Sequence, residues 1–231
     1  MVLFAVSDEA RLRPVLELSP GDLGRAEAPE TRRGPRESSG VYWQRCLVQT
    51  GLFDAKGVTE DSWLVYADDM VTALAVRNLV TAHLVPLLSE SAVTADQIPP
   101  LPGGFALVCG GKAVLTPGCC GDLGDLREWE AAVEHASSSP APVWTGHPSL
   151  WVWREEERLY LREDQEDGYP ASPKTICIRQ AALREAVVGA GRELDRFFAR
   201  VLDILADVHE LPDPVGLAHA LVGRPRAHTL S

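Results

Sequence analysis

The first hundred residues alternate short apolar runs with one long polar stretch, and the runs predict short elements on either side of it. Apolar residues at 2–6 and 14–18 indicate two short strands, or a strand followed by a helix. After the polar stretch, residues 41–50 alternate apolar and polar positions, which predicts a strand because successive side chains of a strand point to opposite faces. Residues 62–66 predict another strand.

Residues 69–86 carry apolar side chains over a broad arc at helical spacing, which predicts a substantially buried helix. Asp68 precedes its first turn, where a carboxylate can cap the helix, and Pro86 marks its expected end. The segment 92–104 contains three prolines and paired glycines, so we expect a connection there.

Two β-hairpins are predicted in the second half of the chain. The apolar runs 105–109 and 113–116 are joined by Gly110 and Gly111, and glycines accept the positive φ values of a two-residue turn. Residues 150–154 and 158–162 form the second hairpin around three consecutive glutamates, with Trp151 and Trp153 on one strand face.

Two helices complete the predicted elements. Asp125 and Glu128 have the spacing of a capping box, and the apolar residues after them predict a helix over 126–137. Residues 178–209 have the periodicity of a long amphipathic helix, in which Gly189 and Gly191 either introduce a break or let another backbone approach.

These elements predict an α+β fold in a single domain, residues 1–231. We expect both hairpins in one antiparallel sheet, with the helix at 126–137 between them and the long C-terminal helix covering a face. Residues 20–40 have hardly any large apolar side chain and cannot repay the entropy of packing, so a mobile loop is expected there. The chain is expected to fray from about residue 224.

Charge and composition exclude several classes of function. The net charge of −11 repels a phosphate backbone, so we expect no binding to nucleic acid. No apolar run approaches the roughly 18 residues of a membrane span, and the N-terminus lacks the basic flank of a secretory signal. We therefore expect a cytoplasmic protein that binds no membrane. Five cysteines without a repeated Cys-x-x-Cys pattern favour reduced thiols.

The familiar catalytic motifs are missing from the sequence. Gly111 and Lys112 suggest a phosphate loop, but Ala106 stands where the earlier glycine is needed and Ala113 where the hydroxyl is needed. The chain also lacks a Gly-x-Ser-x-Gly elbow, a His-Glu-x-x-His helix and the Rossmann glycine pattern. We expect no catalytic residue, cofactor or metal, although these absences do not exclude an enzyme.

Cys119 and Cys120 are the most chemically suggestive residues, because a thiolate can act as a nucleophile or a metal ligand. Adjacent cysteines need further metal ligands from elsewhere in the chain. The candidates, at no recognised spacing, are Cys46, Cys109, Cys177, His135 and His147. Since unpaired cysteines are usually small packing residues, we expect the pair to organise the turn into the following helix, with Asp122 and Asp125 near the helix start.

From Pro117 the chain reads Pro-Gly-Cys-Cys-Gly-Asp-Leu-Gly-Asp-Leu-Arg-Glu-Trp, which resembles a string in SUKH-type immunity proteins of bacterial polymorphic toxin systems. The resemblance covers residues 101 to about 170. The matching positions are Pro117, Cys119, Cys120, Asp122, Leu123 and Trp129. It implies a single α+β domain that binds and neutralises a toxin and has no catalysis of its own.

Residues 122–168 contain twelve acidic and four basic side chains, so we expect the functional surface there and a basic protein, such as a toxin, as its partner. The expected contact residues are Glu155, Glu156, Glu157, Glu163, Asp164, Trp151 and Trp153. The same charge run also fits a solvated face that keeps the protein soluble. Two alternatives to an immunity or regulatory protein stay open. One is an enzyme that uses Cys119 or Cys120 as nucleophile or metal ligand, and the other is a structural adaptor whose aromatic hairpin docks another protein.

Overall fold

A computed structural model describes residues 3–7, 9–18, 39–49, 51–52, 55, 57–59, 63–70, 72–88, 94–164, 174–207, 211 and 213–224. By its internal contacts the chain divides into two compact units. Unit 1 comprises Met1–Pro14 and Pro102–Glu193, and unit 2 comprises Val15–Leu101 and Leu194–Ser231. Each unit is thus assembled from two separate stretches of sequence.

Unit 1 contains a five-stranded sheet with the order β1 (Leu3–Ser7), β9 (Thr175–Arg179), β8 (Arg158–Glu163), β7 (Leu150–Glu155) and β6 (Ala141–Val143). All neighbours are antiparallel except β1 and β9, which are parallel. Alternate residues of β8 are buried, as the pleat of a sheet covered on one face requires. The predicted hairpin β7–β8 is confirmed.

The first predicted hairpin is also present in unit 1, as β4 (Gly103–Cys109) and β5 (Lys112–Leu115). Gly110 and Gly111 have φ of 56° and 77°, as the turn chemistry predicts. The two hairpins do not share a sheet, however, so that part of the prediction is wrong. Each hairpin is specified by its own turn, whereas its assignment to a sheet depends on partners distant in sequence.

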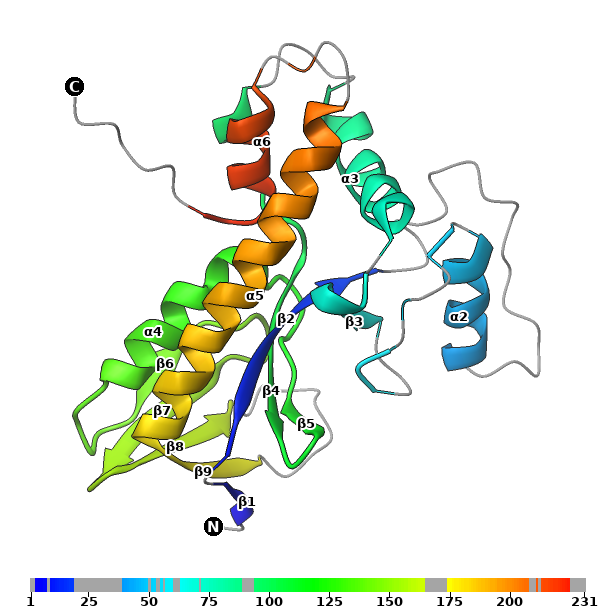
Figure 1. Cartoon of the computed structure of the whole chain (residues 1–231). Coiled ribbons are helices and arrows are strands. Elements are labelled where there is room, and N and C mark those ends of the chain that lie inside the picture. The colour runs from blue at the N-terminus through cyan, green and yellow to red at the C-terminus, as the bar shows by residue number, and fades with distance from the viewer. Residues whose placement is uncertain are drawn as a thin grey trace, which may run out of the picture. The chain divides into compact units, whose positions relative to one another are not determined.

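Figure 1 shows α4 (Leu126–Glu134) and the first half of α5 (Gln180–Ala206) side by side against the five-stranded sheet of unit 1. Gln180 Nε2 donates a hydrogen bond to the Val133 carbonyl at 2.6 Å, which joins the end of one helix to the start of the other. Trp129 and Leu183 are almost fully buried. The helices therefore shield the apolar residues of the sheet from water.

In unit 2, the end of β2 (Arg11–Glu17) pairs antiparallel with β3 (Leu64–Tyr66). The helices of this unit include α2 (Ser39–Gln49), α3 (Ala73–Leu88), α6 (Pro214–Leu221), the second half of α5 and the short 3₁₀ turns η1 (Ala67–Asp69) and η2 (Ala95–Gln97). Trp43 of α2 is buried, and its indole donates to the Leu18 carbonyl at 2.7 Å.

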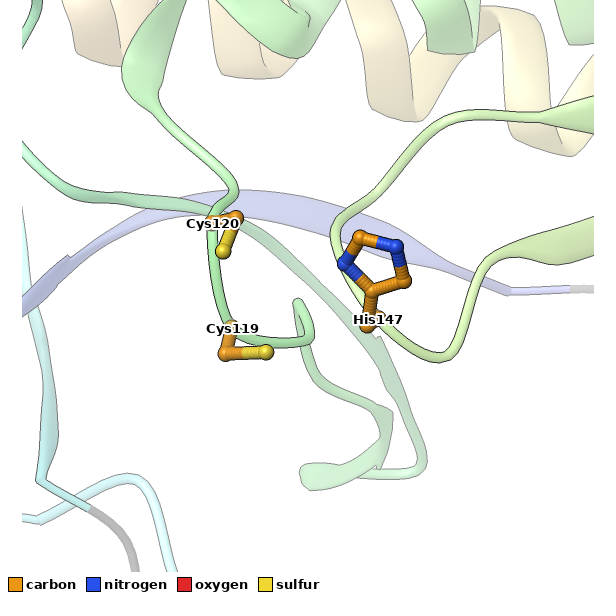
Figure 2. Close-up of side chains that lie close together, drawn as sticks. All are labelled: Cys119, Cys120 and His147. Carbon is orange, nitrogen blue, oxygen red and sulfur yellow. The ribbon is translucent and has the colours of Figure 1, made fainter. Parts of the chain in front are cut away.

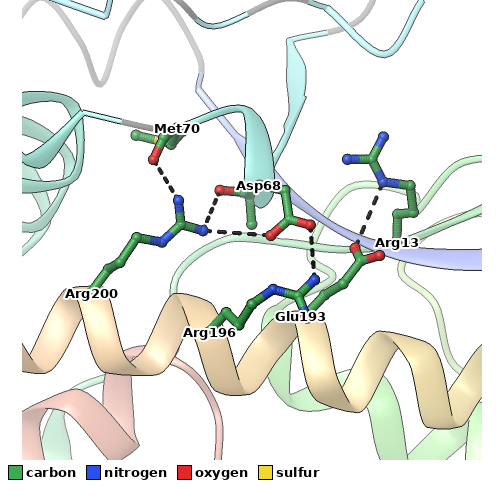
Figure 3. A network of polar contacts seen from close by, with 7 residues as sticks. Arg13, Asp68, Met70, Glu193, Arg196 and Arg200 are labelled. Carbon is green, nitrogen blue, oxygen red and sulfur yellow. Dashed lines mark hydrogen bonds and ion pairs between the residues drawn. The ribbon is translucent and has the colours of Figure 1, made fainter.

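Arg200 of α5 fixes the chain that follows β3. Its guanidinium donates to the carbonyls of Met70 at 2.8 Å and Ala67 at 3.1 Å, while Asp68 lies within ion-pair distance of both Arg200 and Arg196 (Figure 3). Asp68 is therefore not the cap of the next helix. Helix α3 begins at Ala73, where the Thr72 hydroxyl accepts a hydrogen bond from the Ala75 amide, and it continues through Pro86.

Two further sequence predictions are wrong. Residues 41–50 were predicted as a strand, yet 41–49 form most of α2, and residue 50 lies outside the described residues. Trp43, Cys46 and Leu47 also have the i, i+3, i+4 spacing of a helix face, and they are buried. The long helix begins at Gln180 rather than at 178, because residues 175–179 form β9, an interior strand of the five-stranded sheet. Helix α5 continues without a break through Gly189 and Gly191.

The α+β fold class with a long C-terminal helix is confirmed. The single domain stays a prediction. Most of the predicted mobile loop, residues 20–38, and most of the frayed terminus, from 225, lie outside the described residues. Among the helices that the structure describes, none combines the length and apolar composition needed to cross a bilayer.

Candidate functional site

Two loops of unit 1 meet at the cysteine pair. The loop after β5 carries Cys119, and the loop between β6 and β7 carries His147 (Figure 2). The Cys119 amide donates to the His147 carbonyl at 3.2 Å, and the His147 amide donates to the Cys119 carbonyl at 2.9 Å. The Gly118 amide adds a bond to the Thr145 carbonyl at 2.8 Å. These three backbone bonds hold the loops in register.

Glycines permit this close approach of the two backbones. A Cβ atom on Gly118 would lie 2.2 Å from the His147 carbonyl oxygen, and one on Gly146 would lie 2.5 Å from the Cys119 carbonyl oxygen. Gly146 also has φ of +90°, which L side chains rarely adopt. Any larger residue at either position would force the loops apart.

The loops bring three metal-ligating side chains together. The Sγ atoms of Cys119 and Cys120 and a ring nitrogen of His147 all lie within 4.8 Å of one another, and all three residues are exposed. Figure 2 shows a ring nitrogen of His147 facing Cys120. The Trp144 ring meets the imidazole edge-on, with centroids 4.8 Å apart, and restricts its orientation.

Cys120 has an unusual backbone conformation for its residue type. Its φ of 66° lies in the left-handed region, where a residue with a Cβ is less stable than glycine by about 1 kcal/mol. Such strain persists where the surrounding structure imposes it and often accompanies function. The conformation directs the Cys120 side chain toward the same space as that of Cys119 (Figure 2).

A buried carboxylate lies just beyond the cysteines. The Asp122 amide donates to Asp125 at 3.0 Å and the Gly124 amide donates to Asp122 at 2.6 Å, which forms a capping box around the 3₁₀ turn η3 (Leu123–Asp125). The capping box was predicted at Asp125 and Glu128, three residues too late in the chain. The observed box, Asp122 with Asp125, caps the short turn that precedes α4. Burial raises the pKa of Asp125 to about 6, and Asp122 and Glu128 add to this effect, although the bond from Asp122 opposes it.

The residues of the Pro-x-Cys-Cys string divide into two groups. Pro117, Leu123 and Trp129 are buried and belong to the core of unit 1. Cys119 and Cys120 are exposed, and Asp122 is half-buried in its capping box. The expected structural role of the cysteine pair stays a prediction, but the pair is placed at the surface rather than in the core.

The expected partner-binding residues occupy both ends of the β7–β8 hairpin. Glu155, Glu156 and Glu157 lie exposed at its tip. Glu163 pairs with Leu150 at the opposite end, and Asp164 follows it. Six residues of β7 are paired with β8, and the five steps between them, at about 3.3 Å each, separate the two ends by roughly 17 Å. The five acidic residues therefore do not form one patch.

The two tryptophans of β7 differ in accessibility. Trp153 is buried, stacks on Tyr160 with ring centroids 5.3 Å apart, and donates to the Glu155 carboxylate at 3.2 Å. Trp151 is partly exposed. Trp153 therefore supports the hairpin tip from below, and Trp151 is the more accessible aromatic.

Arginines lie near the base of the hairpin tip, on β8 itself and on the elements that follow it in the chain. Arg158 pairs in register with Arg179 of β9, and Arg184 of α5 forms an ion pair with Glu134 at 2.9 Å. The count of charged side chains over residues 122–168 does not include Arg179 and Arg184, because they lie beyond that interval. The surroundings of the tip consequently carry both positive and negative side chains. Their net negative charge is smaller than the charge count for residues 122–168 suggests.

Comparison with protein-family models, with curated proteins and with solved structures found no match to this chain. The site is therefore argued from its own residues. The sequence indicated Cys119 and Cys120 directly and included His147 among several candidate ligands. It gave no signal for the roles of Trp144, Gly118 or Gly146, because those roles depend on contact between loops about 27 residues apart.

Proposed function

We propose that this protein is a non-catalytic binding protein that contacts a basic patch of a protein partner through the β7–β8 hairpin tip. The observation that carries this proposal is that the three carboxylates at the hairpin tip are exposed and lack an ion-pair partner among the described residues. Glu155, Glu156 and Glu157 are exposed, and within the described part of the chain none has a cationic side chain at ion-pair distance.

The arginines near the tip have contacts of their own. Arg154 Nε donates to the Glu156 carbonyl at 2.7 Å, and a guanidinium nitrogen of Arg158 lies 3.8 Å from Cys177 Sγ. Arg184 is held by Glu134. These arginines thus do not pair with the three carboxylates, although Glu155 also accepts a hydrogen bond from the Trp153 indole. Arg154 and Arg158 instead brace the hairpin that presents the carboxylates. Rigid presentation lowers the entropy lost on binding.

The chemistry of such a tip fits a partner whose own site attracts anions. A nuclease toxin holds phosphates in a cationic cleft, and neighbouring carboxylates can occupy such a cleft by imitating phosphate charge. The resemblance of the Pro117–Trp129 string to SUKH-type immunity proteins supports the same proposal. Neutralising a toxin in this way requires no catalytic residue in the inhibitor.

The test measures association kinetics with a basic protein recovered from the native host by the full chain. Replacing Glu155, Glu156 and Glu157 together with Gln should slow association about 10-fold at low salt, because electrostatic steering acts on encounter, and the difference should vanish at high ionic strength. The matched control, Glu163→Gln with Asp164→Asn, removes charge from the opposite end of the hairpin. Equal salt dependence in the wild type and the tip variant would contradict the proposal.

A further inference from the structure

We infer that Cys119, Cys120 and His147 form a metal site for a thiophilic d¹⁰ ion, with Zn²⁺ as the expected occupant. This inference is independent of the proposed partner. It revises the expectation that the cysteines only shape a turn, because the fold supplies the additional ligand that an adjacent pair lacks. The donor set is two thiolates and one imidazole, ligands that Zn²⁺ prefers and that soft ions share.

The separations of the donor atoms fit this assignment. Around tetrahedral zinc, with bonds of about 2.0 to 2.3 Å, donor atoms lie about 3.4 to 3.8 Å apart. The three donor atoms here are already within 4.8 Å of one another. All three residues are exposed at the surface, so small rotations about their side-chain bonds can close the remaining distance without moving the backbone.

The backbone around the cluster is fixed before any ion binds. The paired hydrogen bonds between Cys119 and His147 hold two of the ligating residues in register. Gly118 and Gly146 make that approach possible, and Trp144 orients the imidazole. Cys120 keeps a left-handed backbone conformation in which its side chain joins the other two (Figure 2). A preformed arrangement loses little freedom when the metal binds.

Three protein ligands leave a fourth position of the ion open. Closed structural zinc sites use four protein ligands, whereas a Cys₂His set with water in the fourth position occurs in catalytic zinc sites. Because the cluster is exposed, that position faces solvent and is accessible to water or to a small ligand. Cu(I) is the principal competitor, since two thiolates alone can satisfy it.

The experiment uses the untagged full chain, fully reduced and freed of metal, and titrates Zn²⁺ against a chromophoric chelator. One equivalent should bind. Because changes to groups that merely support a ligand already cost about 10- to 100-fold in affinity, Cys119→Ser, Cys120→Ser and His147→Asn should each lower affinity about 100-fold or more. The matched controls are Cys109→Ser and His135→Asn, which remove the same groups outside the cluster and should leave the affinity unchanged.

A second measurement needs no variant and therefore no assumption about folding. Zn²⁺ should protect Cys119 and Cys120 of the wild-type chain from alkylation, as followed by mass spectrometry, while Cys109 keeps its own rate. Three results would overturn the inference. They are the absence of stoichiometric Zn²⁺ binding, Zn²⁺ binding that survives loss of both cysteines, and a preference for Cu(I) that is unaffected by His147→Asn.

Discussion

Asp125, in the turn after the cysteines, should make the stability of the protein depend on pH. The carboxylate is only 5% exposed, and burial raises its pKa from 3.8 to about 6. The folded chain therefore holds the proton more tightly than the unfolded chain, and stability is lost as pH rises from about 4 to about 6. Two pKa units correspond to about 3 kcal/mol of unfolding free energy across that range.

We predict that Asp125→Asn removes this dependence. The variant should gain stability relative to wild type as pH rises from 4 to 7, because the neutral amide keeps an oxygen for the Asp122 amide without carrying a charge. Urea unfolding at several pH values measures the difference. Glu130→Gln, which removes an exposed carboxylate of α4, controls for net charge. Parallel stability curves for wild type and Asp125→Asn would show that Asp125 does not titrate in this way.

The candidate metal site shows what a sequence conveys about single residues. Cys119 and Cys120 are adjacent, so their chemistry could be recognised directly. His147 is one of six histidines, and nothing in its neighbours distinguishes it from His135. What selects it is the pairing of two loop backbones, which requires small residues at 118 and 146. That pairing is a tertiary contact and has no periodic signature along the chain.

At the scale of elements, local turn chemistry was the reliable signal. Both hairpins lie where the sequence predicts them, because Gly110 and Gly111 set the first turn and three consecutive glutamates mark the second. Helix α2 was predicted as a strand, and the start of helix α5 was predicted two residues too early. Residues 41–50 satisfy both periodicities. The predicted long helix included residue 178 of strand β9, because the apolar run at 176–178 adjoins a helical pattern. A short buried strand and a helix segment have the same apolar composition.

Helix α5 offers a prediction of its own through Gly189. This residue lies inside a continuous helix, and a Cβ added to it would meet no atom within 4 Å. Gly189→Ala should therefore stabilise the protein by about 1 kcal/mol, since alanine restricts the unfolded chain and favours the helix. Thermal and urea unfolding measure the change. Val188→Ala, an exposed neighbour, serves as the matched control, and a destabilised Gly189→Ala variant would contradict this view of the helix.

For the whole molecule, the sheet arrangement could not be read from the sequence. Strand β1, near the N-terminus, pairs in parallel with β9, which begins at residue 175. Such a pairing closes a very long loop. No turn motif next to either strand indicates which strand it pairs with. The fold class follows from the types of element present, whereas the topology depends on which distant strands meet.

The path of the chain leads to a prediction about cooperativity. Each compact unit contains two stretches of sequence, so the chain passes between the units three times. One passage lies between Leu101 and Pro102, and the other two lie inside regular elements, within strand β2 and within helix α5. Because no flexible linker separates the units at those two points, we predict that the full chain unfolds in one transition. The calorimetric and van't Hoff enthalpies should then agree.

Core substitutions placed in each unit make this test decisive. Leu161 of β8 in unit 1 and Leu47 of α2 in unit 2 are both fully buried. Truncating either to alanine should cost about 2 to 5 kcal/mol through lost burial and the cavity left behind. If unfolding is cooperative, either variant moves the entire transition to lower temperature, whether it is followed by helix signal or by tryptophan fluorescence. If instead Leu161→Ala produces a separate early transition while the remaining signal keeps the wild-type midpoint, the units unfold independently and the single-domain prediction is wrong.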